Sequence, residues 1–128
     1  PYEGIPEMLK ALKDKGIQLA VLSNKPDRQT VKVVKAIFGE ELFDYAQGQK
    51  EGIRRKPEPD GVWYLMEQMH VSKEECLYIG DSEVDAATGR NAGLKTIGVL
   101  WGFRDRKTLE TAEVDDLIDR PDELLQFV

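Results

Sequence analysis

Short apolar runs alternate with helical patterns along this chain of 128 residues. The runs at 17–22, 76–79 and 95–100 are typical of buried strands, and 43–47 is a weaker candidate. Helical segments of about ten residues separate the runs, so each strand reaches the next through a right-handed crossover. The alternation predicts an α/β fold: a doubly wound, Rossmann-like parallel sheet with helices on both faces.

Glycine, proline and capping residues indicate where the helices begin and end. We expect helices over about 4–16, 27–38, 60–69, 83–92 and 107–112, and a last helix that starts at Pro121. Gly16 and Gly39 stand at C-terminal stops, and His70 ends the third helix. Residues 72–75 have the form of a capping box, and a short apolar stretch lies at 117–118.

Length and composition limit the number of domains and the kinds of partner that the chain can have. Apolar residues make up 41% of the chain, enough for one core but not two, so residues 1–128 are expected to form a single domain. The net charge of -6 argues against a nucleic-acid partner, which requires a basic face. No stretch approaches the ~20 apolar residues of a membrane span, so no membrane partner is expected.

Cysteine and histidine each occur once. With Cys76 alone no intrachain disulfide can form, and a cytoplasmic protein is the default expectation. With His70 alone, a His-based triad and a His-rich metal cage are both excluded. The chain begins with Pro1 rather than methionine, and we expect it to be the C-terminal part of a longer parent chain.

Two carboxylates follow one of the predicted strands. Asp81 and Asp85 lie one helical turn apart, after Gly80, which lets the backbone approach a ligand. Ser82 and Asp85 also match a capping box, so these side chains could simply close the start of a helix. The convergence of two acids at a strand–helix junction favours a cation site, and hard oxygen ligands with room for water suit Mg²⁺.

Two further polar residues fall where a doubly wound sheet binds ligands, beyond the carboxyl ends of its strands. Ser23 ends an apolar run and could donate one hydrogen bond to a phosphoryl oxygen, although serine there is more often a turn former. Lys56 opens a Lys-Pro-Glu-Pro segment, which is either an ordinary turn before a helix or a rigid mount for an ammonium over a phosphate. The neighbouring cations Lys50, Arg54 and Arg55 are as readily explained by a solvated face.

Taken in order, these residues resemble the haloacid dehalogenase-like superfamily of phosphohydrolases. Ser23 is similar to its second motif, Lys56 to its third, and Gly80-Asp-Ser-Glu-Val-Asp85 to its fourth. The phosphoglycolate phosphatase branch is the closer resemblance, carried also by Ser23-Asn-Lys-Pro26, Asn91-Ala-Gly93 and Gly98-Val-Leu-Trp-Gly-Phe-Arg104. Related members act on other sugar phosphates, nucleotides or pyrophosphate.

The resemblance implies a role for each matching residue. Ser23 would bind the phosphoryl group, with Asn24 as a neighbour, and Lys56 would neutralise both nucleophile and phosphate. Asp81 would bind Mg²⁺, and Asp85 would support the metal directly or through water. Gly80 and Ser82 would shape the metal loop, and the substrate would be a small phosphate monoester such as phosphoglycolate.

One family motif has no counterpart in the chain. The family's Asp-x-Asp segment supplies the nucleophile that becomes an aspartyl-phosphate, and no Asp-x-Asp occurs in residues 1–128. The resemblance starts just after the family's cap, so it implies a core that lacks its first strand and a fragment that is inactive alone. Two alternatives remain: a receiver-like phosphoacceptor domain, disfavoured by the reversed order of its acids and lysine, and a non-catalytic remnant that binds phosphate or a partner.

The absent strand would lie centrally, between the strand ending at Ser23 and the strand ending at Ile79. Two inner edges would then expose unpaired backbone groups. We expect either direct pairing of 17–22 with 76–79, which we favour, or insertion of a strand from a second chain or an N-terminal segment.

Overall fold

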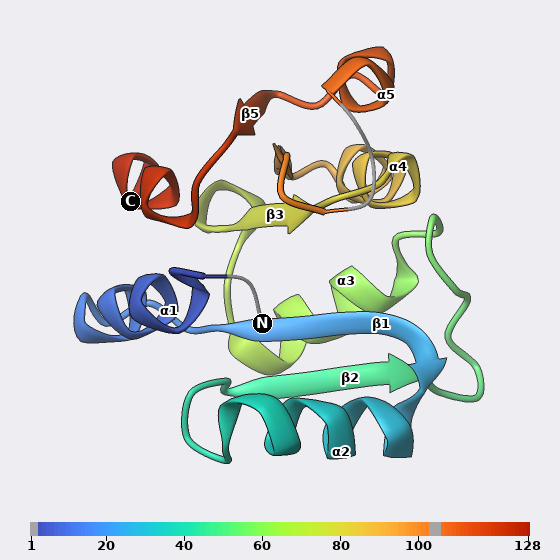
Figure 1. The fold of residues 1–128 in the computed structure, drawn as a ribbon. Helices are drawn as coiled ribbons and strands as arrows, with labels where there is room; N and C mark the ends of the chain where they lie inside the picture. Colours follow the sequence, from blue (N-terminus) through green and yellow to red (C-terminus); the bar gives the residue numbers. More distant parts are fainter. Residues whose placement is uncertain (1–2, 103–105) are drawn as a thin grey trace.

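The computed structural model describes residues 3–102 and 106–128, and its helices and strands alternate as the sequence predicts (Figure 1). The strands are β1 (Ala20–Pro26), β2 (Tyr45–Gln49), β3 (Leu77–Gly80), β4 (Lys95–Val99) and β5 (Asp116–Ile118). The α-helices are α1 (Ile5–Asp14), α2 (Asp27–Phe38), α3 (Asp60–Met69), α4 (Glu83–Ala92) and α5 (Arg106–Thr111). Two 3₁₀ segments, η1 (Lys73–Glu75) and η2 (Pro121–Phe127), complete the order.

The strands form two parallel sheets rather than one. β1 pairs with β2, and β4 lies between β3 and β5. Within the described residues β1 and β3 share no ladder, so the expected direct pairing of 17–22 with 76–79 is wrong.

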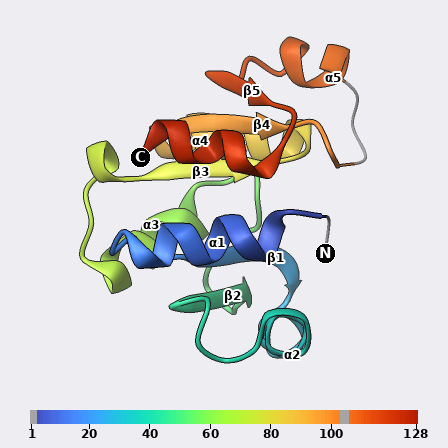
Figure 2. The same ribbon diagram turned by 60° about the vertical axis from the view of Figure 1, so that its left-hand side comes forward.

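Helix α1 contributes to the apolar core that the two sheets share. Its apolar face, Met8, Leu9 and Leu12, shares one core cluster with Leu19 beside β1 and with buried residues of β4. The helix therefore packs against both sheets at once and bridges the interval between them (Figure 2). Side-chain packing joins the two sheets, in place of backbone hydrogen bonds between β1 and β3.

Helices cover both faces, which confirms the doubly wound architecture. On one face α1 and η2 pack on the first cluster, to which α2 adds Phe38. On the other face α3 and α4 enclose Val62, Ala92 and Leu94, with Leu22 and Tyr78 packed against them. Figure 2 shows α1 and η2 in front of the strands and α3 and α4 behind.

The first strand begins later than the apolar run suggests. The N–H of Ile17 donates to Leu12 O at the end of α1, 3.2 Å away, and the N–H of Leu19 donates to the Asp44 carboxylate at 2.7 Å. These groups are therefore unavailable to a ladder. At its other end β1 runs past Ser23, with a shift of register between Leu22 and Pro26, so Ser23 lies inside the strand and not beyond it.

Several smaller expectations can also be compared with the structure. The capping box at 72–75 is confirmed, because the N–H of Ser72 donates to Glu75 Oε1 at 3.0 Å. His70 ends α3 in a left-handed conformation, with φ 56°. The apolar stretch at 117–118 is strand β5, whereas the last helix is 3₁₀ and not α-helical. Among the described residues, no helix has the length and apolar character needed to cross a membrane.

Candidate active site

The carboxyl ends of β1, β2 and β3 point in the same direction, so the polar residues after them gather at one edge of the two sheets (Figure 1). Lys56 lies at the centre of this edge. It belongs to the loop between β2 and α3, and hydrogen bonds hold it from β1 and from α4.

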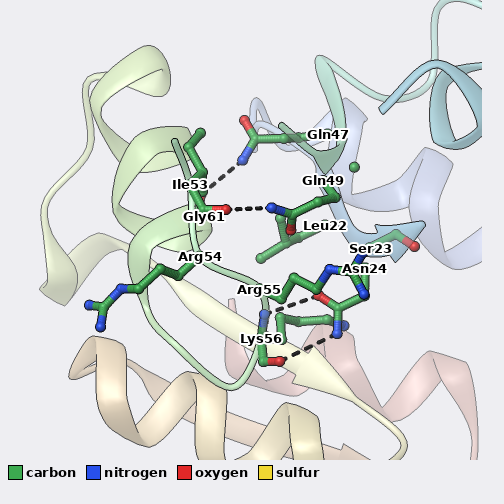
Figure 3. A pocket seen from close by; sticks show the side chains of 11 residues that line it. Leu22, Ser23, Asn24, Gln47, Gln49, Ile53, Arg54, Arg55, Lys56 and Gly61 are labelled. Carbon is green, nitrogen blue, oxygen red and sulfur yellow. Dashed lines mark hydrogen bonds between the residues drawn. The ribbon is translucent and has the colours of Figure 1, made fainter. Parts of the chain in front are cut away.

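Asn24 of β1 fixes the backbone of Lys56 through both ends of its side-chain amide (Figure 3). Asn24 Oδ1 accepts from the N–H of Lys56 at 3.0 Å, and Asn24 Nδ2 donates to Lys56 O at 3.4 Å. From the other side Asn91 of α4 donates to the carbonyl of Pro57 at 2.9 Å. The segment that carries the lysine is thus hydrogen-bonded to β1 on one side and to α4 on the other.

The Lys56 ammonium reaches Asp85, on the first turn of α4. Lys56 Nζ lies 2.8 Å from Asp85 Oδ1, and both side chains are about 15% exposed, at 15% and 14%. Asp85 Oδ2 also accepts from the N–H of Asp81 and from the hydroxyl of Ser82, both at 3.2 Å. An ion pair at this depth depends on such additional donors to offset the loss of water.

Ser82 is the N-cap of α4, which is one half of the predicted capping box; in the other half the Asp85 carboxylate accepts from the N–H of Asp81 rather than from that of Ser82. The hydroxyl oxygen of Ser82 accepts from the N–H of Asp85 at 3.2 Å and starts α4. Gly80 allows this closed loop, because a Cβ there would overlap the Cβ and carboxylate of Asp85. Capping and site formation are therefore the same set of contacts.

Asp81 differs from Asp85 in having an open carboxylate. Its side chain is partly buried and makes no hydrogen bond or ion pair with the part of the chain that the structure describes. Nor do the described residues hold a cluster of three acidic, histidine or cysteine side chains around a common point. One open carboxylate fits Mg²⁺, which commonly takes one or two protein carboxylates and completes its shell with water and phosphate oxygens.

Ser23 and Asn24 line a small pocket at the carboxyl ends of β1 and β2, together with Lys56 (Figure 3). Ser23 Oγ accepts from the N–H of Lys25 at 3.1 Å, the local turn contact that is common for serine. The hydroxyl keeps its own proton available for a ligand.

The run of cations does not act as one patch. Arg54 points away from the pocket (Figure 3) and pairs with Asp60 at 2.9 Å, and this carboxylate raises the pKa of the guanidinium. Lys50 Nζ lies 5.3 Å from the centre of the Tyr64 ring. Lys56 pairs with Asp85 of α4, whereas Arg54 and Lys50 have partners elsewhere, so the solvated-face interpretation holds for those two.

Three residues near the site were given no role by the sequence. Asn91 and Gly102 lie in segments that resemble the family but carry no chemistry of their own in the sequence, and Tyr78 lies in the apolar run 76–79. Burial, and then the negative charge of Asp85, raise the pKa of Tyr78. Side chains alternate between the two faces of a strand, and this period could have placed Tyr78 on the face that α4 covers. Asn91 and Gly102 contact residues far away in the chain, so no local sequence pattern indicates those contacts. Phe103 and Arg104, which end the motif 98–104, lie outside the described residues.

Known proteins share this sequence and fold. A sequence model of the family described as haloacid dehalogenase-like hydrolase matches residues 1–99. A phosphoglycolate phosphatase of Aquifex aeolicus is 34% identical over 128 residues, which are 100% of this chain and 59% of that protein. The pyrophosphatase PpaX of Bacillus anthracis is 32% identical over 99% of this chain and 59% of its own length. The chain thus spans little more than half the length of these relatives.

Solved structures confirm the fold. A crystal structure from Lactobacillus delbrueckii subsp. bulgaricus, provisionally named a phosphoglycolate phosphatase, aligns with a TM-score of 0.95 and 39% identity. The alignment covers 99% of this chain and 53% of that one. Such a score over nearly the whole chain means that the two half-sheets occur in the same arrangement in a solved structure.

Proposed function

Because this chain belongs to the haloacid dehalogenase-like hydrolase family, we propose that the whole protein is a magnesium-dependent phosphatase that acts on a small phosphate monoester. The placement of Lys56 is the observation that supports the proposal most strongly. Its backbone is held by Asn24 and its ammonium lies 2.8 Å from Asp85. Ser23 lines the same pocket as Lys56, and Asp81 directly follows β3. A fixed point charge at that place suits a phosphoryl group.

In this proposal the residues of the chain bind and orient the phosphate. Ser23 donates its hydroxyl proton to a phosphoryl oxygen, and Lys56 offsets the negative charge of the phosphate. Asn24 acts through the backbone of Lys56, and Gly80 and Ser82 shape the loop that carries Asp81. Asp81 would hold Mg²⁺, with Asp85 as its support, and the cation would supply charge stabilisation to the transferring phosphoryl group.

The reaction needs a nucleophile that residues 1–128 do not offer as an Asp-x-Asp segment. An aspartate would attack phosphorus as the bond to the ester oxygen breaks, and the departing alcohol would take a proton. Water would then release inorganic phosphate and restore the carboxylate. Residues 1–128 alone would bind phosphate without turning it over.

The unpaired strands provide a place for such a nucleophile. β1 and β3 each have a strand neighbour on one side only among the described residues. Lys56 is held by Asn24 of β1 and by Asp85 of α4, the helix that follows β3. We propose that an extended segment, from the parent chain or from a second chain, pairs with both edges and carries the aspartate to the site. Unpaired edges readily accept a strand.

An assay of the whole protein tests the proposal. Phosphoglycolate, pyrophosphate and a generic aryl phosphate are offered with Mg²⁺ and with a chelator, and Asp81→Asn serves as the matched variant. We expect release of phosphate that requires Mg²⁺ and falls by orders of magnitude in Asp81→Asn. No Mg²⁺-dependent release from any of the three would contradict the phosphatase and favour a non-catalytic phosphate-binding protein.

A further inference from the structure

The segment that leaves β4 lies directly against Asp81. A Cβ on Gly102 would overlap the Cβ and the carboxylate of Asp81, with Cγ only 2.7 Å away. The backbone at 102 therefore touches the side chain of the one acid at the site whose carboxylate has no other partner among the described residues.

Two contacts fix the residues that lead up to Gly102. The N–H of Leu100 donates to Ile118 O of β5 at 3.0 Å, and the side chain of Trp101 packs on the first core cluster. These two contacts hold the chain as far as Trp101, the residue directly before Gly102. Residue 102 would have to yield to any side chain placed there, or Asp81 would.

A second glycine stands in the same relation to the second acid. Gly80 leaves the space that the Asp85 side chain fills, and Asp85 is also held by Lys56 and Ser82. Asp81 lacks those hydrogen bonds, so the backbone of Gly102 is its main restraint. The carboxylate lies with Oδ2 against the backbone of Gly102 and has no hydrogen bond or ion pair among the described residues, so its lone pairs are not taken up by protein donors there.

We infer that Gly102 is a positioning residue for the metal site: its bare backbone holds the Asp81 carboxylate in the orientation that binds Mg²⁺. The inference rests on the proposed role of Asp81. It gives a physical reason for glycine at position 102 of the family-like motif. A side chain there would displace the Asp81 carboxylate, and we expect Lys56 and Ser23 to keep their positions.

The test compares Gly102→Ala with Gly98→Ala in the whole protein. Gly98 is the matched control: it lies in β4, and its added Cβ would meet Leu117 at 2.9 Å, away from Asp81. We expect Gly102→Ala to weaken binding of Mg²⁺ alone, measured by calorimetry, about tenfold or more, the equivalent of about 1.4 kcal/mol. The KM for phosphate ester at saturating Mg²⁺ should change less than twofold. Gly98→Ala should lower the melting temperature but leave Mg²⁺ affinity within twofold.

A double variant separates this inference from the proposed function. If Gly102 acts through Asp81, the fall in melting temperature caused by Gly102→Ala should be at least halved in an Asp81→Gly background, since the overlapping side chain is gone. An Mg²⁺ affinity unchanged by Gly102→Ala would overturn the inference while the phosphatase proposal stood. Should Gly102→Ala fail to fold and Asp81→Gly not restore folding, the overlap with Asp81 is not what Gly102 avoids, and the inference also falls.

Discussion

Two lysine–aspartate pairs of nearly the same geometry lie at opposite ends of the strands. Before β1, Asp44 accepts from Lys13 Nζ and from the N–H of Leu19, both at 2.7 Å. After β3, Asp85 accepts from Lys56 Nζ at 2.8 Å and from the N–H of Asp81 at 3.2 Å. Each carboxylate thus joins a cation to a backbone donor.

The two pairs differ in their surroundings. These surroundings, and not the ion pairs themselves, distinguish a candidate functional site from a structural contact. Asp44 fixes the residues between α1 and β1, and its pair with Lys13 is 30% and 29% exposed. The Asp85 pair is about half as exposed. Its lysine lines a pocket with Ser23, and Asp85 accepts from the N–H of Asp81, whose carboxylate has no partner among the described residues. An ion pair alone is therefore weak evidence for a site. Open polar groups held in place beside it are much stronger evidence.

Replacing each lysine with alanine should give the largest difference in activity between the two pairs. In the whole protein we expect Lys56→Ala to lower kcat/KM about 10²- to 10³-fold, the usual cost of one preorganised electrostatic group. Lys13→Ala should leave kcat/KM within about twofold, because its partner is remote from the strand ends. Steady-state assays with Mg²⁺ held saturating measure both, and equal losses would contradict the distinction between the pairs.

Removing the two carboxylates should affect stability by different amounts. Asp85→Ala leaves the Lys56 ammonium, the Ser82 hydroxyl and a backbone N–H without their acceptor, at a cost of about 2 to 3 kcal/mol. Asp44→Ala leaves a more exposed lysine and one N–H, at about 1 kcal/mol. Urea unfolding of both variants provides the comparison. A larger loss for Asp44→Ala would mean that exposure does not govern the strength of these pairs.

Much of the fold could be predicted from short-range patterns in the sequence. The bounds of α2 and α4 match the prediction because Gly39 and Ser82 end and begin helices through contacts within a few residues. The start of β1 could not be predicted, since Leu19 donates to a carboxylate 25 residues away. The separation of β1 from β3 could not be predicted either, because no local pattern records how two strands far apart in the chain lie relative to each other.

The candidate site likewise has residues that the sequence could predict and contacts that it could not. Ser23, Asp81 and Asp85 could be proposed because each follows an apolar run that is typical of a strand, and Lys56 because it opens a proline-bounded segment before a helix. The structure adds that Lys56 pairs with Asp85 and that Asn24 holds the lysine's backbone. Gly102 could not be found, because its meaning lies in contact with a residue 21 positions earlier in the chain.

The smallest effect we expect is a difference in acid sensitivity at Asp44. Burial raises the pKa of this carboxyl, but the hydrogen bond from Lys13 and that from Leu19 outweigh it, so the pKa in the folded state is lowered. Such a group stabilises the fold above its unfolded pKa of about 3.9, and the contribution is lost as the pH falls through the lower folded value. Asp44→Asn should therefore be less stable than wild type at pH 7, and the two unfolding curves should converge below about pH 4. Glu41→Gln, an exposed change three residues earlier, is the control and should follow wild type throughout. Urea midpoints from pH 7 to about pH 2.5 measure this, and wild-type and Asp44→Asn curves that stay parallel would show that the Lys13 pair does not contribute through the charge of Asp44.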